Sequence, residues 1–123
     1  MRLPQAEERL MKHLWKQRRA FMQDLWGAYP EPKPAKTTLA TLLKRLIGRD
    51  FVGYEQRGAV REYYPKVSRN AYFSGLLKGM VQHFFEGSNA AFASFFAENM
   101  DLSEAELEKL RQVVEDQLKN REG

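Results

Sequence analysis

The chain has 123 residues, of which 43% are hydrophobic and 29% are charged, and it contains no cysteine. This length fits one ordinary domain, or one compact domain with a short appendage, and the hydrophobic content is enough for a core. The lack of cysteine excludes disulfides, thiol redox chemistry and cysteine-based metal sites in this sequence. No apolar run approaches the ~20 residues that a membrane-crossing helix needs, so we expect a cytoplasmic protein that does not insert into membranes.

The net charge of +4 is distributed unevenly along the chain. Residues 1–67 contain 14 Lys and Arg against 7 Asp and Glu, whereas residues 68–123 contain 6 against 9, so the two parts carry +7 and −3. A basic part beside a mildly acidic part indicates a module that binds a polyanion, joined to a part with another task. A merely solvated basic surface would give the same numbers, so the asymmetry alone leaves both interpretations open. We predict one domain over each part.

The basic part begins with two predicted helices. Residues 5–16 have apolar side chains at helical spacing, and residues 20–28 are expected to form a shorter second helix. Glu7 and Glu8 are interpreted as solvated charges at the start of the first helix. The prolines of residues 30–34 exclude a helix or a central strand, so this segment is expected to be a stiff turn.

The clearest pattern is a third predicted helix over residues 35–49. Its apolar residues recur at i, i+3, i+4, i+7 and i+8 and predict one buried stripe, formed by Leu39, Leu42, Leu43, Leu46 and Ile47. The opposite face is small, hydroxylic or basic, and consists of Lys36, Thr37, Ala40, Thr41, Lys44 and Arg45. An ordinary solvated helix face includes glutamate, so the absence of acidic residues favours contact with a polyanion.

A β-hairpin is predicted after this helix. Residues 51–57 and 60–65 are rich in aromatic and β-branched residues and flank a turn that contains Gly58. Pro65 closes the second strand, which we interpret as an edge strand. Arg57 and Arg61 lie on either side of the tip. Three helices followed by a basic hairpin form the winged helix-turn-helix plan, in which one helix enters the major groove of DNA.

The acidic part is predicted to be helical and to hold a dimer together. Six of the eight phenylalanines lie between residues 73 and 96, and a last helix with a capping box starts at Ser103 and Glu106. So much apolar surface on so short a chain is typical of a subunit contact. The fold class is therefore mainly α with a small β-hairpin wing and a C-terminal helical dimerisation region. The expected interface residues are Tyr72, Phe73, Leu76, Leu77, Met80, Phe84, Phe85, Phe92, Phe95, Phe96, Leu107, Leu110 and Val114.

The order of these parts resembles the penicillinase and methicillin-resistance repressors of the BlaI/MecI/CopY type. The segments that carry the resemblance, over nearly the whole chain, are Leu14-Trp15, residues 37–46, residues 51–54, Tyr63-Tyr64-Pro65 and residues 101–104. The resemblance implies a homodimer with an N-terminal winged helix and a C-terminal helical dimerisation region. It also implies repression by occupation of a dyad-symmetric double-stranded DNA operator.

The chain departs from the family pattern in three places. Copper-responsive members carry a cysteine cluster that is missing here, so we expect no metal and no cofactor. Antibiotic-responsive members are cleaved at an Asn-Phe bond within the dimerisation region, in a system with a membrane-bound sensor peptidase. The matching position is Phe95-Phe96, a candidate cleavage site without its asparagine. The third helix also has Ala40 where some members have arginine, so the operator is expected to differ.

We predict that Thr37, Thr38 and Thr41 contact base edges, since a threonine hydroxyl can donate or accept and its methyl can contact thymine. The predicted contacts to the DNA backbone are Lys33, Lys36, Lys44, Arg45, Arg57 and Arg61. No nucleophile group, phosphate-binding glycine loop or spaced histidine ligands occur, so we do not expect an enzyme. Two alternatives remain open: a winged-helix adaptor that binds an acidic protein, and a sequence-neutral architectural DNA binder.

Overall fold

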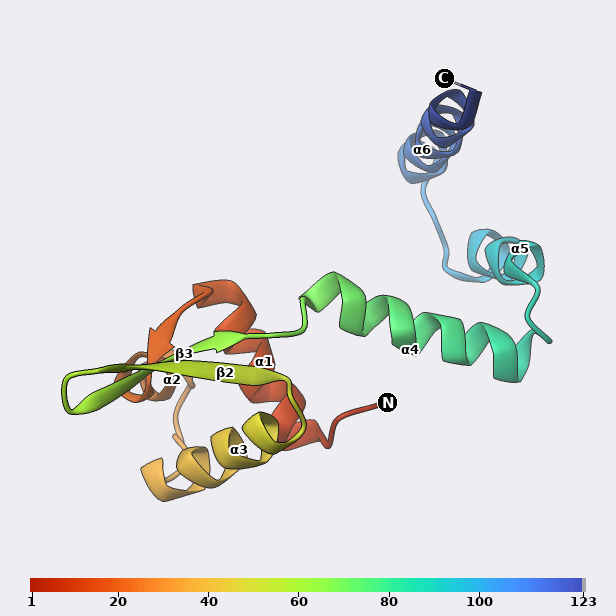
Figure 1. The fold of residues 1–123 in the computed structure, drawn as a ribbon. Helices are drawn as coiled ribbons and strands as arrows, with labels where there is room; N and C mark the ends of the chain where they lie inside the picture. Colours follow the sequence, from red (N-terminus) through yellow and green to blue (C-terminus); the bar gives the residue numbers. More distant parts are fainter. Residues whose placement is uncertain (123) are drawn as a thin grey trace. The chain divides into compact units, whose positions relative to one another are not determined.

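The computed structural model describes residues 1–122 and divides into two compact units (Figure 1). Unit 1, Met1–Leu77, is called the winged-helix unit below, and unit 2 begins at Lys78. The described chain has six helices and a three-stranded antiparallel sheet. The helices are α1 (Gln5–Gln17), α2 (Met22–Ala28), α3 (Lys36–Gly48), α4 (Arg69–Phe84), α5 (Asn89–Asn99) and α6 (Glu104–Glu122). The strands are β1 (Ala20–Phe21), β2 (Val52–Arg57) and β3 (Val60–Pro65).

The winged-helix unit has one hydrophobic core, which confirms the predicted fold class. Helices α1, α2 and α3 pack against one another and against the sheet, and β2 and β3 form the wing (Figure 1). The predicted stripe of α3 faces this core, with Leu39, Leu42, Leu43 and Leu46 all buried. Helical periodicity places these four leucines on one side of α3, so burial of one side leaves the other side of the same helix to solvent.

The start of the predicted second helix is wrong. Ala20 and Phe21 form the short strand β1, which pairs with Tyr63 and Glu62 of β3, and α2 begins only at Met22. Arg18 ends α1 with a φ of 70°, which reverses the chain direction, and the Asp24 carboxylate accepts a hydrogen bond from the Phe21 backbone N–H at 3.0 Å. These local features place Phe21 outside the helix and leave Ala20 and Phe21 extended beside the sheet.

The interpretation of the second hairpin strand as an edge strand is also wrong. The strand order is β1-β3-β2, so β3 lies in the middle of the sheet. Proline is accommodated there because β1 reaches only as far as Tyr63, whereas Pro65 pairs with Val52 of β2 alone. At this residue β3 therefore has a neighbour on one side only, and the missing N–H of proline interrupts no bond to β1.

Glu7 is not the solvated charge that the sequence suggested. Its side chain is 1% exposed, and its Oε1 accepts a hydrogen bond from Arg49 Nε at 2.9 Å. The neighbouring Glu8 accepts a hydrogen bond from the Tyr72 hydroxyl at 2.6 Å. Glu7 lies three and seven residues before Leu10 and Leu14 and so shares their buried face. Both acidic side chains of α1 therefore serve contacts within the winged-helix unit.

Unit 2 contains the end of α4 together with α5 and α6. Ser88 caps α5 by accepting a hydrogen bond from the Ala91 N–H at 3.0 Å. The predicted capping box of α6 is confirmed, because Ser103 N donates to Glu106 at 3.0 Å and Glu106 N donates to the Ser103 hydroxyl at 3.1 Å. None of the helices within residues 1–122 is long and apolar enough to cross a membrane.

Candidate nucleic-acid interface

The side of α3 that faces away from the core is open to solvent along its whole length. Thr37, Thr38, Thr41, Lys44 and Arg45 are all exposed. The first turn of this helix contains no acidic residue, so its positive N-terminal end is not neutralised locally. The predicted base-contact residues and two of the predicted phosphate-contact residues thus occupy one accessible, acid-free helix surface.

The three threonines occupy different positions on this surface. Helical spacing puts Thr37 and Thr41 in line along its centre, while Thr38 lies on the same flank as Arg45. The Thr41 hydroxyl donates to the backbone carbonyl of Thr37 at 3.1 Å. This hydroxyl oxygen can still accept a hydrogen bond, and the Thr41 methyl group is free for apolar contact.

A shallow groove separates α3 from the wing on the other flank. Helix α3 contributes Ala40 and Lys44 to its lining, and the wing contributes Tyr54 and Arg61. The Arg61 guanidinium stacks over the Tyr54 ring, with its central carbon 4.1 Å from the ring centroid. Stacking of this kind fixes the direction of a long side chain and leaves its N–H groups at the edge of the ring available for an acceptor.

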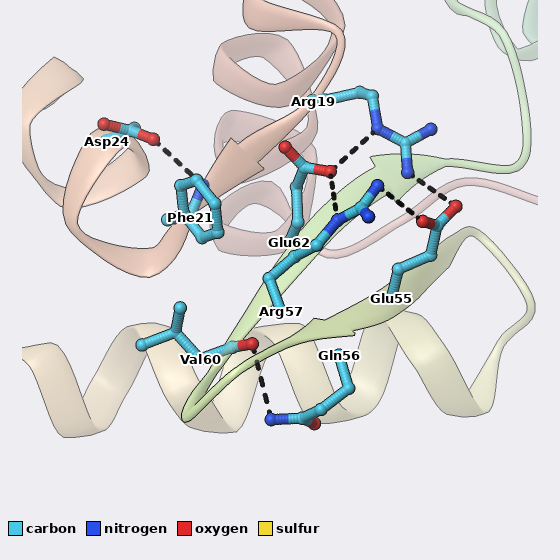
Figure 2. Close-up of polar contacts among 8 residues, drawn as sticks. All are labelled: Arg19, Phe21, Asp24, Glu55, Gln56, Arg57, Val60 and Glu62. Carbon is cyan, nitrogen blue, oxygen red and sulfur yellow. Dashed lines mark hydrogen bonds and ion pairs between the residues drawn. The ribbon is translucent and has the colours of Figure 1, made fainter.

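The two wing arginines lie on opposite faces of the hairpin. Arg57 donates toward Glu55 at 2.7 Å and Glu62 at 3.4 Å, and Arg19 donates to the same two carboxylates at 2.8 and 3.1 Å (Figure 2). The register sets Glu55 directly opposite Glu62, which would be repulsive without the two arginines. The hydrogen bond from Arg19 also lowers the pKa of Glu55. Arg57 therefore belongs to a neutralised cluster and is not brought together with Arg61.

Lys33 and Lys36 are gathered around Trp26. Both ammonium groups lie over the indole ring, 5.0 and 4.8 Å from its centroid. Lys33 also donates to the carbonyl oxygens of Gly27 and Tyr29 at the end of α2, where the helix leaves acceptors unsatisfied. The sequence did not assign Trp26 this role, although a tryptophan shortly before a proline-rich turn with two lysines is a usable signal. Lys33 is engaged within the protein, and Lys36 is exposed.

Ion pairing separates the cations of the winged-helix unit into two groups. Five of them are paired with carboxylates, namely Arg2, Arg19, Arg49, Arg57 and Lys66. The others have no ion-pair partner among residues 1–122, and those on the exposed side of α3 and on the wing beside it are Lys36, Lys44, Arg45 and Arg61. The positive potential of this surface is therefore uncompensated, as a surface that attracts phosphates requires.

The predicted interface residues fall into three groups. Exposed side chains include Phe84 at 68% and Phe95 at 50%, together with Phe73, Met80, Leu107 and Val114. Five others are half-buried, namely Leu77, Phe85, Phe92, Phe96 and Leu110. Tyr72 is only 7% exposed and Leu76 packs beside it, both against the core of the winged-helix unit. The candidate cleavage bond Phe95-Phe96 lies inside α5.

The two histidines lie beside aromatic rings. His13 packs against the ring of Tyr29, with ring centroids 4.4 Å apart. The pKa of His13 is lowered mainly by burial, and also by the positive charges of Lys16 and Arg9. His83 packs against Phe84. Within residues 1–122 no group of three or more histidine, cysteine, aspartate or glutamate side chains could hold a metal ion.

Comparison with known proteins adds a relationship that covers both units. The sequence model of the family described as penicillinase repressor matches residues 3–116. The penicillinase repressor of Bacillus licheniformis is 26% identical over 117 residues, which cover 94% of this chain and 91% of that protein. The methicillin resistance regulatory protein MecI of Staphylococcus aureus is 24% identical over 110 residues, which cover 89% of each chain. The similarity therefore extends well beyond the winged-helix unit.

Proposed function

Because the chain belongs to the penicillinase repressor family, we propose that this transcriptional repressor acts in the cytoplasm as a homodimer on a dyad-symmetric DNA operator. The observation that carries the proposal is the exposed, acid-free face of α3, with threonines along its centre and unpaired cations around it. The major groove of B-DNA is about 12 Å wide and admits one helix. Each half of the operator would therefore receive one α3.

Base reading is assigned to Thr37, Thr38 and Thr41. Thr37 is in the first turn of α3, the end that a recognition helix turns toward the bases. Thr41 is one turn later and offers its methyl group and one acceptor position. Short hydroxylic side chains also allow the helix backbone to approach the groove floor closely, so the protein would discriminate bases by both hydrogen bonds and thymine methyl contacts.

Contacts to phosphates are assigned mainly to the unpaired cations Lys36, Lys44, Arg45 and Arg61. Lys44 and Arg61 line the groove between α3 and the wing, so one phosphate strand could lie between them. Arg57 can reach a phosphate only by leaving Glu55 and Glu62, and Lys33 only by leaving the end of α2. These two are therefore expected to contribute less than the other four.

Dimerisation is assigned to the exposed apolar side chains of unit 2 and the adjoining part of α4. One winged helix makes few base contacts. In a dimer, binding of the first winged helix to DNA makes binding of the second effectively intramolecular. Cleavage at Phe95-Phe96 would separate α6 from the rest of the chain and thereby weaken operator binding without altering α3. A membrane-bound sensor peptidase system is the corresponding partner that would trigger this cleavage.

Fluorescence anisotropy tests the proposal. The purified protein is titrated against its own upstream DNA and against a scrambled duplex of equal length, at about 150 mM salt. We expect a preference of at least about a hundredfold, because specific binders exceed their non-specific affinity by ~10³ or more. Equal, salt-labile binding to both, repeated with a second upstream region, would contradict base reading and support an architectural DNA binder. No binding to any duplex would instead support a protein adaptor.

A further inference from the structure

A second basic surface lies on α1, away from the face of α3. Arg9, Lys12 and Lys16 follow one another at i, i+3 and i+7, all are exposed, and together they are called the α1 ridge. Helical spacing places them directly opposite the side chains that α1 buries, such as Leu10 and Leu14. None of the three has an ion-pair partner within residues 1–122.

The acidic residues of α1 form no ion pair with the ridge. The helix contains two, Glu7 and Glu8. Glu7 is buried against Arg49, and Glu8 accepts the Tyr72 hydroxyl while its side chain is only 13% exposed. Both carboxylates therefore serve contacts that hold the winged-helix unit together. Neither forms an ion pair with a ridge cation, although Glu8 lies with Arg9 and Lys12 around one hollow.

The ridge carries an electrostatic cost in the free protein. Like charges three or four residues apart on a helix destabilise it, and the ridge contains two such pairs. Arg69, across a hollow lined also by Lys12, Trp15 and Lys16, adds a further positive charge. A row of phosphates would remove this repulsion, so the charge pattern is complementary to a nucleic-acid backbone.

The ridge and the face of α3 lie on different sides of the winged-helix unit. Helices α1 and α3 pack on each other through their buried sides, so their exposed sides point away from each other. The ridge itself consists of cations, which suit phosphates, and the exposed Gln5 continues it one helical turn earlier.

We propose that the α1 ridge binds the phosphate backbone of a second DNA segment, without sequence preference, while α3 occupies the operator. This inference rests on the proposed function for the role of α3. A repressor with both surfaces would bridge two duplexes or hold the two arms of a loop. It would also keep a local reservoir of non-specifically bound DNA next to each operator.

A capture experiment tests the bridging. A duplex selected from a random pool by the full chain is immobilised and saturated with protein, unbound protein is washed away, and an unrelated fluorescent duplex is added. We expect capture of the second duplex. In the variant Arg9→Gln/Lys12→Gln/Lys16→Gln its affinity should fall on the order of a hundredfold at about 150 mM salt, because each phosphate contact contributes a slope of ~0.9 in log K against log salt.

A matched control removes three cations elsewhere. The variant Lys109→Gln/Lys119→Gln/Arg121→Gln loses the same charge from α6 and should capture the second duplex like the wild type. Affinity for the immobilised duplex should stay within about threefold in both variants, because specific binding is assigned to α3. Equal capture by the ridge variant and the α6 variant, or no capture by the wild type, would overturn the inference.

The two proposals fail in distinguishable ways. If no duplex is selected from the pool, base reading by α3 fails. The ridge is then tested by direct titration of both variants with the unrelated duplex. The ridge variant should bind this duplex more weakly and with a salt slope smaller by about 2.7, the value for three lost phosphate contacts. An unchanged slope would refute the ridge whatever the result for the operator.

Discussion

Replacement of Arg49 by methionine is expected to destabilise the winged-helix unit by about 3 kcal/mol. Arg49 Nε donates to Glu7 Oε1 at 2.9 Å, and the Glu7 side chain is 1% exposed. Removal of one partner of a buried ion pair leaves an uncompensated buried charge and costs ~3–5 kcal/mol. Arg49 itself is 37% exposed, so water already screens part of the interaction, and the low end of that range applies.

Urea unfolding followed by tryptophan fluorescence measures this loss where it occurs. Both tryptophans, Trp15 and Trp26, belong to the winged-helix unit, so their signal reports that unit and not α5 or α6. With an m-value of about 1–2 kcal/mol/M, a loss of about 3 kcal/mol lowers the midpoint by about 1.5–3 M. Protein concentration has to be held constant, because the proposed dimerisation would raise apparent stability.

The same helix supplies the control. Arg45 lies one turn before Arg49, is exposed and has no ion-pair partner within residues 1–122, so Arg45→Met should change stability by no more than about 0.5 kcal/mol. The double variant Glu7→Leu/Arg49→Met should recover most of the loss, because apolar residues often replace a buried pair without cost. A midpoint for Arg49→Met that matches Arg45→Met would refute the reasoning.

Three further predictions concern charge. Lys44→Gln should weaken binding to operator and scrambled DNA alike and lower the salt slope of an anisotropy titration by about 0.9, the value for one phosphate contact. The Ser103 N–H and hydroxyl lower the pKa of Glu106, so its stabilisation of α6 is present above pH 4.5 and is lost as the pH falls through the lowered pKa. Circular dichroism should show less acid-induced loss of helix in Glu106→Gln. Arg19→Gln should raise the pKa of Glu55 in an NMR titration, since Arg19 is the main cause of its lowering.

Local patterns were sufficient for most of the fold. The leucines of α3 recur at a strict helical period, and burial of this stripe is the largest local free-energy gain that the segment can make. The capping box at Ser103 and Glu106 is equally local, because both hydrogen bonds join residues three apart. Where the decisive interaction is encoded within a few residues, the sequence predicts the element and its boundary.

Contacts between distant residues were not predictable in the same way. Glu7 is charged and stands in a first helical turn, which is the usual place for a solvated acid. Its burial depends on Arg49, which is 42 residues away and reaches it only after α1 and α3 have packed. Strand β1 is similar, because two residues have no recognisable strand pattern, and Ala20 and Phe21 become a strand only where β3 offers an unpaired side.

The wing arginines lie between these two cases. The turn at Gly58-Ala59 is two residues long, so Arg57 must pair with Val60, and Arg61 must pair with Gln56. Because side chains alternate along a strand, this register alone predicts that Arg57 and Arg61 face opposite ways. The same register puts Glu55 and Glu62 on the face of Arg57, and these two carboxylates pair with it. No local rule brings Arg19 from the end of α1 to the same carboxylates, however. Of the two arginines on the hairpin, only Arg61 is therefore expected to bind a DNA phosphate readily. A DNA titration that compares Arg61→Gln with Arg57→Gln should show the larger loss of affinity for Arg61→Gln.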